Sequence, residues 1–411
     1  LVDPSSGQAD TEITITGERL CGGGDEVANV TLAGLNADVI NPNCNLIQVK
    51  ANDLGAEVIG DVVVISNTGA TVTKEDAFEY LGAGNITSVS PNAGQGTTIV
   101  TIDGNDLLGG GSEVVSVTLA GIVAQVTSDK TNADRLIVRA NVGPTAEGSE
   151  TGDVVVTGDT GVQITAINAF TYSTVTAIEP AVGQGGTEVT ITGVALLATG
   201  DDIATVTLNG VEVESIVSAS ATEVIVVASA IENGQAQKGT AVITMDNGQV
   251  IESIALTDGS LIKEFEYAVP GAITSVYPVI GQLNTVVTIV GTGMFGQGDE
   301  LVNVTLAGVV ADIISQTNTK VVVHAGVSGG TATGDVILTS ETGAIVEIAS
   351  SWTYVDVGII TDVSPAKGQL NTKLTITGSD LMAGGLEIAG VTLAGVAIKE
   401  LVSNSSTEVV V

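Results

Sequence analysis

Short stretches in which apolar and polar residues alternate recur along the whole chain, separated by glycine, proline, asparagine and aspartate. Alternation of β-branched residues over about four to eight positions is typical of strands with one buried face. No stretch shows the period of an amphipathic helix. In the copy that shows the pattern most clearly, the alternation predicts strands at 86–90, 97–102, 115–120, 122–127, 136–140, 154–157 and 167–172.

Two short phrases recur at the same step of about 90 residues, which identifies a tandem array of one domain type. The first phrase, Val-Thr-Leu-Ala-Gly with Asn for Ala in its third copy, contains Thr31, Thr118, Thr207, Thr305 and Thr392. The second phrase, Pro-x-x-Gly-Gln, begins at Pro4, Pro91, Pro180, Pro278 and Pro365. We therefore expect domains at 1–82, 83–173, 174–269 and 270–356 and a partial fifth at 357–411.

Each repeat has seven or so short strands and is long enough to bury a core of its own, which predicts an antiparallel β-sandwich. The linkers are a few residues long, and none is a Gly/Ser-rich or Pro-rich tract. We expect consecutive domains to touch and form a semi-rigid rod about 150–200 Å long. The third repeat is longer because of residues around 245–263, which we interpret as an enlarged hairpin and, as a hypothesis, a lateral contact.

The repeat resembles the IPT/TIG domain, an immunoglobulin-like fold of the early-set type. The residues that carry the resemblance are 86–97, 100–104, 117–121 and 169–172, and similar residues occur in every copy. The resemblance implies an all-β chain of tandem immunoglobulin-like sandwiches. Such domains occur in plexin-type receptors, in large surface proteins and beside the catalytic domains of some secreted glycosidases, so the fold implies spacing, adhesion or assembly without fixing one role.

The chain carries 47 acidic against 12 basic residues, a formal charge of −35. Such a surface repels phosphate backbones and anionic lipid headgroups, so nucleic acid and membrane surfaces are poor partners, and we expect no nucleic-acid partner. No apolar run is long enough for a membrane-spanning helix, so we expect no membrane insertion. The chain opens and stops inside a repeat, and we interpret it as a window on a longer extracellular or cell-surface protein.

Cys21 and Cys44 both lie in the first repeat. A metal or redox pair is one alternative, but their separation, with no histidine nearby, fits neither a CxxC motif nor a zinc site. In a chain that otherwise looks extracellular, we expect them to form a disulfide.

The last strand of each repeat carries two aromatic residues spaced by two, which places both on one face of the strand. Packing in the core is the main interpretation, and a sugar-stacking platform is the alternative. The pairs are Phe78 and Tyr80, Phe170 and Tyr172, Phe265 and Tyr267, and Trp352 and Tyr354.

Nothing in the sequence indicates catalysis. The single histidine, His324, stands in a predicted strand without a serine or cysteine partner in a known motif. Nucleophile elbows, zinc spacings and phosphate-binding loops are absent from the sequence. We therefore expect neither an enzyme nor a resident cofactor.

Acidic residues recur in glycine-rich loops just before the Val-Thr-Leu-Ala-Gly strand. Calcium takes six to eight oxygens, so one or two carboxylates need help from carbonyls or a neighbouring domain. We interpret these loops as solvated, with calcium at the domain joints as the alternative. The candidates are Asp25, Glu26, Asp201, Asp202, Asp299 and Glu300.

Asn-x-Ser/Thr sequences, which accept N-linked glycans in secreted eukaryotic proteins, occur at Asn29, Asn85, Asn303 and Asn404. We expect Asn29 and Asn303 to face solvent because the neighbouring valines face the core. Asn85 falls at a predicted joint and Asn404 in a predicted turn. Chance occurrence is the alternative, since asparagine and threonine are common here.

These observations favour a structural repeat protein that forms or supports an extracellular filament, hair or sheath, and that associates with copies of itself through exposed strand edges. A first alternative is the stalk of a cell-surface adhesin or receptor that binds a protein or a glycan. A second alternative is an accessory region of a secreted polysaccharide-active enzyme.

Overall fold

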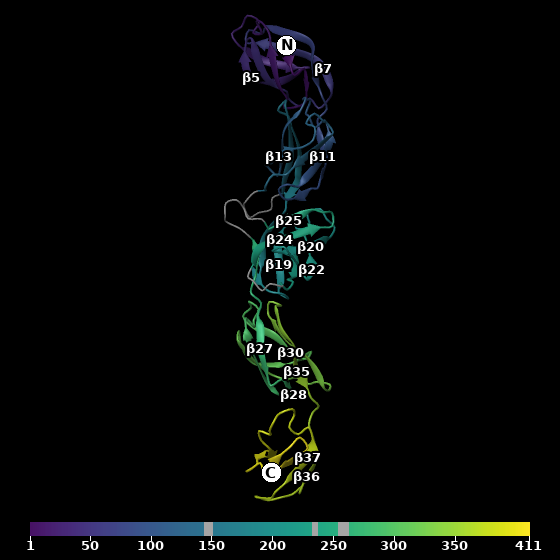
Figure 1. Ribbon diagram of the computed structural model, residues 1–411. Coiled ribbons are helices and arrows are strands. Elements are labelled where there is room, and N and C mark those ends of the chain that lie inside the picture. The colour runs from purple at the N-terminus through teal and green to yellow at the C-terminus, as the bar shows by residue number, and fades with distance from the viewer. Residues whose placement is uncertain (144–150, 232–236, 254–262) are drawn as a thin grey trace.

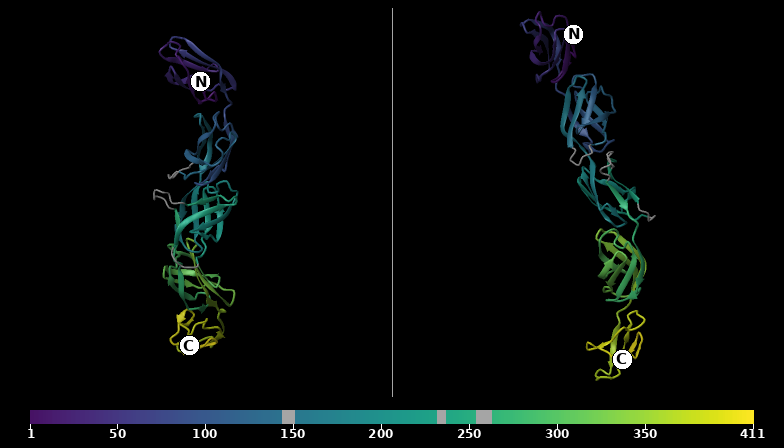
Figure 2. Two further views of the ribbon diagram at one scale, coloured as in Figure 1. Left: turned by 45° about the horizontal axis from the view of Figure 1, so that its top comes forward. Right: turned by 90° about the vertical axis from the view of Figure 1, so that its left-hand side faces the viewer.

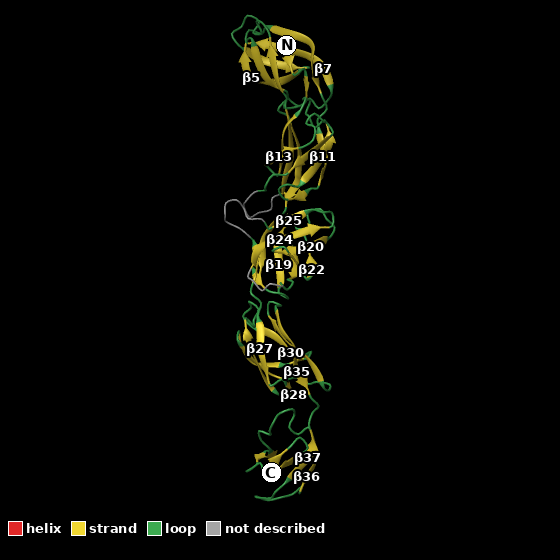
Figure 3. Cartoon of the chain, in the orientation of Figure 1, coloured by secondary structure: helices red, strands yellow, loops and turns green. Residues whose placement is uncertain are grey.

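The computed structural model describes residues 1–143, 151–231, 237–253 and 263–411, and in these residues every regular element is a β-strand (Figure 3). The all-β immunoglobulin-like prediction is confirmed. Figures 1 and 2 show the repeats following one another, with the N-terminus at one end of the molecule and the C-terminus at the other. We call the units repeats 1 to 5, using the ranges given above.

Repeats 1 and 2 contain corresponding strands in the same order. Repeat 1 contains β1 (Val2–Asp3), β2 (Ser6–Gly7), β3 (Glu12–Thr16), β4 (Val27–Leu32), β5 (Leu35–Asn43), β6 (Leu46–Lys50), β7 (Val58–Ser66) and β8 (Thr71–Tyr80). Repeat 2 contains β9 (Asn85–Ser90), β10 (Ala93–Gly94), β11 (Ile99–Asn105), β12 (Val114–Leu119), β13 (Ile122–Val126), β14 (Arg135–Arg139), β15 (Thr151–Gly158) and β16 (Gln163–Tyr172).

Repeats 3 and 4 continue the pattern. Repeat 3 contains β17 (Thr174–Glu179), β18 (Val182–Gly183), β19 (Glu188–Val194), β20 (Ile203–Leu208), β21 (Val211–Glu212), β22 (Ser215–Ala219), β23 (Glu223–Val227), β24 (Gln237–Met245), β25 (Val250–Glu252) and β26 (Glu264–Tyr267). Repeat 4 contains β27 (Ala272–Tyr277), β28 (Ile280–Gly281), β29 (Val286–Thr292), β30 (Leu301–Leu306), β31 (Val309–Val310), β32 (Asp312–Thr317), β33 (Lys320–His324), β34 (Ala332–Ser340) and β35 (Ile345–Tyr354).

Repeat 5 as far as residue 411 contains the first strands of the same pattern. They are β36 (Ile359–Ser364), β37 (Thr375–Ser379), β38 (Thr392–Leu393), β39 (Val396–Ala397), β40 (Ser403–Asn404) and β41 (Glu408–Val410).

Each of the first four repeats is a sandwich of two sheets. In repeat 4 the strand order is β27-β29-β33-β32 in one sheet and β28-β35-β34-β30-β31 in the other. In repeats 1 and 2 the third long strand pairs in both layers: β5 pairs with β4 in one sheet and with β6 in the other. The two layers therefore share a strand in those repeats.

The alternating residues form one core in each of the first four repeats. In repeat 2, Val117 and Leu119 of the recurrent phrase and Phe170 of the closing strand are fully buried. Burying one such side chain contributes about 1.5–3 kcal/mol. The two aromatic rings of each closing strand meet edge to face, with ring centroids 5.0–5.5 Å apart. All eight are at most 2% exposed, so the core interpretation is confirmed and a sugar-stacking platform on these pairs is excluded.

The Ala-Gly end of the first phrase forms the tight turn of a hairpin. Ala33 and Gly34 both have positive φ, 46° and 85°, as two-residue hairpin loops with the twist of the flanking strands require. Gly60 of β7 passes over this turn, where a Cβ would lie 2.6 Å from the Cα of Ala33. The turn of the recurrent phrase and a glycine of the neighbouring strand, found again at Gly152, Gly239 and Gly334, therefore fit together by close backbone approach.

Candidate functional site: the joints between repeats

The second recurrent phrase, which lies near the start of each repeat in sequence, forms a turn that fixes a glutamine. The backbone N–H of Gln184 donates to the Thr187 hydroxyl at 3.1 Å, and the N–H of Thr187 donates back to the Gln184 carbonyl at 3.1 Å. A Cβ on the preceding Gly183 would lie 2.8 Å from the Thr187 side chain, so this position needs glycine. Residue 268, just after the closing strand, donates its N–H to the Gly183 carbonyl at 2.7 Å. The turn thus places the glutamine beside the start of the linker.

Gln184 joins repeat 3 to repeat 4. Its side-chain carbonyl accepts the backbone N–H of Gly271 at 2.9 Å, and its side-chain amide donates to the Ile345 carbonyl at 2.7 Å. Two backbone bonds accompany it, from Glu188 N–H to the Thr342 carbonyl at 2.9 Å and from Ile345 N–H to the Gly185 carbonyl at 3.2 Å. Gln184 is 2% exposed, and both ends of its amide are satisfied by the next repeat.

Joints 1–2 and 4–5 use the glutamine at the same position of the phrase. Gln8, 5% exposed, accepts the N–H of Gly84 at 2.7 Å, and Glu12 donates its N–H to the Thr160 carbonyl at 3.1 Å. The side chain of Gln282 accepts the N–H of Gly358 at 3.1 Å. Joints 1–2, 3–4 and 4–5 therefore each place a linker glycine against the glutamine of the preceding repeat.

Joint 2–3 is built differently because its linker is shorter and contains no glycine. Gln95 makes a reciprocal pair with the backbone of Glu252, donating to its carbonyl at 2.9 Å and accepting its N–H at 2.8 Å. Gln249 donates back to the Ala93 carbonyl at 3.0 Å. The Gln95 side chain thus hydrogen-bonds the backbone of β25 in the way that a neighbouring strand would.

A crevice of 520 Å³ opens at joint 2–3. Thr97 and Ile99 line it from repeat 2, and Thr199, Asn247 and Gln249 line it from repeat 3. In the part of the chain that the structure describes, its lining carries hydroxyl, amide and aliphatic groups but no charged side chain. The positions of Ile99 and Asn247 correspond to Glu188 and Thr342, which are bonded to each other at joint 3–4.

The glycine-rich loops that precede the first phrase also belong to the joints. A Cβ on Gly110 would lie 3.0 Å from the Cα of Gly7, and one on Gly296 would lie 3.3 Å from the Gln184 side-chain amide. The absence of a side chain at these positions lets the loop of one repeat close on the glutamine turn of the repeat before it. The acidic residues of these loops predict solvated loops or calcium sites, and they give no sign of this packing between repeats.

The glutamines themselves were also missed. The Gly-Gln pair recurs in every copy of the second phrase, but the sequence pattern alone assigns its glutamine no role. A polar residue that recurs at each boundary, next to a linker only a few residues long, is the signal that would have found them.

Comparison with known families decides what these repeats are. The sequence model of the IPT/TIG domain matches residues 1–80, 85–172 and 173–257, more than half of the chain. The chain belongs to the IPT/TIG domain family. Repeats 4 and 5 carry the same two phrases as the matched IPT/TIG repeats. No curated protein matches the chain.

Several solved structures are similar to this chain at low identity. The plexin A4 full extracellular region matches at 14% identity and a TM-score of 0.32, over 100% of this chain and 46% of that one. The surface glycan-binding protein SGBP-B of Bacteroides ovatus, in complex with a mixed-linkage heptasaccharide, matches at 13% identity and a TM-score of 0.20, over 68% of each chain. The N-terminal eight Ig domains of DSCAM match at 11% identity and a TM-score of 0.20, over 92% and 51%. The chain spans about half the length of the plexin structures it matches.

The acidic candidates of the IPT/TIG loops are all exposed. Asp202 accepts the N–H of Ile203 at 2.8 Å, and the N–H of Asp299 donates to Glu341 at 2.6 Å. Within residues 1–143, 151–231, 237–253 and 263–411, no three acidic, histidine or cysteine side chains are grouped as a metal site would need. Asp25, Glu26, Asp201 and Glu300 thus offer at most paired carboxylates, and calcium binding stays a prediction to be tested.

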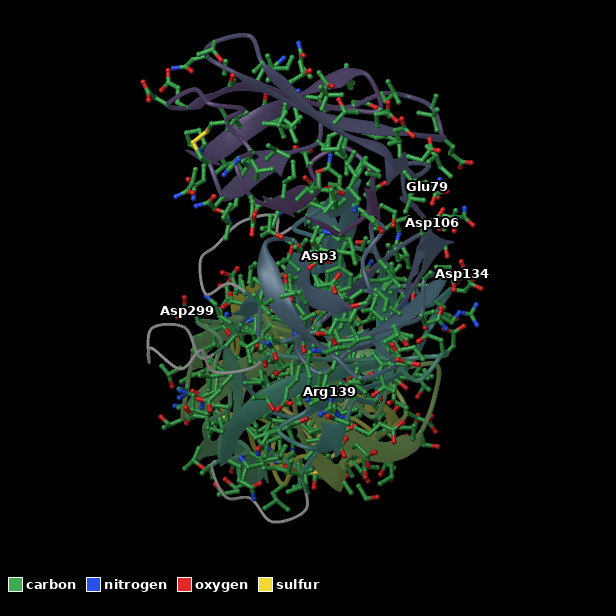
Figure 4. All side chains as sticks on the ribbon, turned by 90° about the horizontal axis from the view of Figure 1, so that it is seen from above. Asp3, Glu79, Asp106, Asp134, Arg139 and Asp299 are labelled. Carbon is green, nitrogen blue, oxygen red and sulfur yellow. A yellow bond between two sulfur atoms is a disulfide. The ribbon has the colours of Figure 1, made fainter. Side chains whose placement is uncertain are left out.

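The structure joins Cys21 and Cys44 as a disulfide, with their Cα atoms 5.1 Å apart. Cys21 is buried in the core of repeat 1, and Cys44 packs against that core. Figure 4, viewed along the length of the molecule, shows the bond in yellow and the labelled carboxylates of Glu79, Asp106 and Asp134 at the periphery.

The four glycosylation candidates fall on strands. Asn29 and Asn303 occupy equivalent positions in β4 and β30 and are half-buried, while Val30 and Val304 next to them are fully buried. Asn85 is exposed at joint 1–2. Asn404 lies in β40, paired with Val409, so the expected turn was wrong. Occupancy of these sites stays a prediction.

His324 is half-buried in β33, opposite Val286 of β29 and Asp312 of β32. In repeat 3, β24 and β25 form a hairpin, but residues 254–262 of the expected enlargement lie outside the described part of the chain. No helix in the described ranges is long and apolar enough to cross a membrane.

Proposed function

We propose that this chain is a spacer segment of a secreted or cell-surface protein, in which docked IPT/TIG repeats act as a semi-rigid rod that supports an extracellular filament, hair or sheath. The observation that carries the proposal is the recurrent glutamine joint. Every joint from 1–2 to 4–5 has a glutamine of one repeat bonded to backbone groups of the next. Gln8 and Gln184 are buried, and Gln95 and Gln282 are half-buried. A joint closed by hydrogen-bonded polar groups resists bending more than a flexible linker does.

The disulfide and the charge support an extracellular setting. Disulfides persist in oxidising compartments, and a net charge of −35 keeps a long exposed chain soluble. The glutamine joints set the spacing of the repeats, so the function that we propose is mechanical.

Small-angle X-ray scattering of the whole chain tests the rod. We expect a maximum dimension of about 150–200 Å that changes little between low and moderate salt. A much smaller dimension, or a distribution that broadens toward compact shapes, would contradict it. Electron microscopy of the native material then separates a filament, with a repeat equal to a whole number of domains, from isolated rods that end in a separate head.

A second candidate function, a binding module, is favoured by the crevice at joint 2–3. Its neutral hydroxyl and amide lining suits a neutral, hydroxyl-rich ligand such as a glycan segment. Titration of the whole chain with neutral polysaccharides, and with an Asn247→Ala variant, tests this candidate. Binding that Asn247→Ala abolishes would favour the module, and absence of binding would leave only the spacer.

A further inference from the structure

One sheet of repeat 4 has an outer face unlike its counterparts in repeats 1 and 3. The outward side chains of β27, β29, β33 and β32 form a grid of three rows that run across the strands, and we call this grid the repeat-4 face. Its rows are Val286, His324 and Asp312, then Tyr277, Thr288, Val322 and Ser315, and then Ser275, Val290, Lys320 and Thr317.

The repeat-4 face exposes apolar side chains. Tyr277 is 78% exposed, Val286 51% and Val290 38%. The other four tyrosines of the chain are at most 2% exposed. Tyrosine is among the side chains that are enriched at the centre of protein interfaces.

Folding does not require apolar residues at these positions. The residue that corresponds to Tyr277 is Asp3 in repeat 1 and Glu179 in repeat 3, each in the same pairing with a threonine of the second strand. The residue that corresponds to Val286 is Glu12 in repeat 1 and Glu188 in repeat 3. Repeat 4 therefore carries tyrosine and valine where the same fold accepts carboxylates.

We propose that the repeat-4 face packs against the repeat-4 face of a second copy of this chain, in a two-fold, face-to-face contact. Two copies of the grid can face each other across a two-fold axis that runs along the middle row. A two-fold axis along that row sets Tyr277 against the same tyrosine of the second copy, and Val286 of each copy against Val290 of the other. Face-to-face sheets pack with their strands nearly aligned, which this axis allows.

The charges of the grid fit the same arrangement. Asp312 and Lys320 lie in opposite outer rows, on the adjacent strands β32 and β33. The two-fold axis exchanges the outer rows, so Asp312 of each copy falls over Thr317 of the other, one strand away from Lys320. Each lysine thus gains a carboxylate of the second copy. Elsewhere a chain of charge −35 repels its own copies, and this face, with one lysine and one carboxylate, presents little repulsion.

The size of the face sets the strength of the contact. Four strands about 4.8 Å apart and three rows about 7 Å apart give a footprint of roughly 400 Å². Stable dimers bury about 800 Å² on each partner, so a single contact between free chains is weak. Where many chains lie side by side, the contacts add as multivalent links. Salt screens the general repulsion and so strengthens the contact.

Sedimentation equilibrium of the whole chain tests the proposal, from about 1 μM to about 1 mM, at low and at moderate salt. We expect the mass to rise toward that of a dimer at the high end, and to rise earlier in the higher salt. The double variant Tyr277→Glu with Val286→Glu installs the residues that repeat 3 carries at the same positions. It should keep its fold, checked by circular dichroism, and weaken association at least about tenfold.

Val302→Glu is the matched control, since Val302 is 60% exposed on β30 of the opposite sheet of repeat 4. It should leave association unchanged. Lys320→Asp alone should weaken the dimer, and Lys320→Asp with Asp312→Lys should restore it. A chain that stays monomeric at the highest concentration in both salts, whether or not a glycan binds it, overturns the proposal. So does a dimer that survives Tyr277→Glu with Val286→Glu. Neither result bears on the rod dimension, which scattering measures separately.

Discussion

Asp153 of β15 accepts a hydrogen bond from the backbone N–H of Asn168 at 2.8 Å, and Asn168 is held with a φ of 50° in the middle of the partner strand β16. The pairing register between the two strands shifts between Gly152 and Val154. The same contact joins Asp61 to Asp76 at 3.0 Å and Asp335 to Ser350 at 2.7 Å. A left-handed residue is costly outside glycine, and the aspartate offsets that cost by satisfying the amide that the shift leaves without a strand partner.

Replacing this aspartate should loosen one hairpin. Asp153→Ala removes the acceptor of an exposed hydrogen bond and leaves the Asn168 N–H to solvent, at a cost of about 0.5–1.5 kcal/mol. Hydrogen exchange should report faster exchange in β15 and β16 and no change in repeat 4. Asp153→Asn retains the accepting oxygen and should stay close to the original protein. Equal exchange in all three proteins would show that the contact contributes nothing.

The glutamine joints predict a local change of stiffness. Gln184→Ala removes both side-chain bonds across joint 3–4 and leaves the Gly271 N–H without its acceptor. Electron microscopy of the whole chain should show a wider distribution of angles between repeats 3 and 4, and the amides of Gly271 and Ile345 should exchange faster with solvent.

Gln369→Ala is the control for that experiment. Gln369 makes the same backbone turn with Thr372, but it is exposed, and its side chain makes no hydrogen bond to the residues that the structure describes. It should leave all angles between repeats 1 and 5 unchanged. Equal flexibility of the two variants would contradict the role of Gln184.

Reduction of the disulfide should destabilise repeat 1 alone. The bond closes a loop of about 24 residues, for which chain entropy gives about 3 kcal/mol. Thermal unfolding in reductant should show an early transition assigned to repeat 1 by exchange in β4 to β6. The other repeats contain no cysteine and act as internal controls, so a uniform shift of every transition would argue against this account.

Two buried phenols predict a loss of stability at alkaline pH. Burial raises the pKa of Tyr172 and of Tyr267 to about 12, from a usual value of 10.0. As the pH rises from 10 toward 12, the unfolded chain releases a proton that the folded chain retains, so stability is fully present below pH 10 and falls through that window. Each pKa unit corresponds to about 1.4 kcal/mol per tyrosine. Tyr172→Phe should remove this pH dependence from repeat 2 while repeat 3 keeps it, as alkaline unfolding followed by phenolate absorbance can show.

The acidic loops predict that a chelator leaves thermal stability unchanged. Asp299 and Glu300 are exposed, and no group of three acidic, histidine or cysteine side chains that could hold a metal ion occurs within the described ranges. Calcium takes six to eight oxygens, which a pair of carboxylates does not supply alone. Melting curves with and without chelator check this expectation. A lower melting temperature in chelator, restored by added calcium, would establish a calcium site that uses carbonyls or an adjoining chain.

The fold could be predicted because its causes are local and repeated. In repeat 2, β12 and β13 lie within one residue of their predicted bounds, since the alternation of buried valine and leucine and the Ala-Gly turn act over adjacent residues. The start of β16 at Gln163 was missed because the shift at Asn168 breaks the alternation. Only the contact with Asp153, distant in sequence, explains why the strand continues through it.

The site was harder to predict because it lies between domains. A pattern of periodic apolar residues indicates what each repeat buries inside itself, and it says nothing of what a glutamine meets outside. Gln95 and Gln184 occupy the same place in the same phrase, yet one bonds Glu252 and the other Gly271 and Ile345. The difference depends on the length of the linker and the orientation of the next repeat.

The glutamine joint also bears on how such a chain changes in length over generations. Each glutamine bonds the main-chain groups of its neighbour, which every repeat possesses whatever its side chains are. A gene segment that encodes one repeat can be duplicated or lost without any matched pair of side chains having to change with it. The length of the protein is then free to vary in whole domains while the rule by which neighbours dock stays the same.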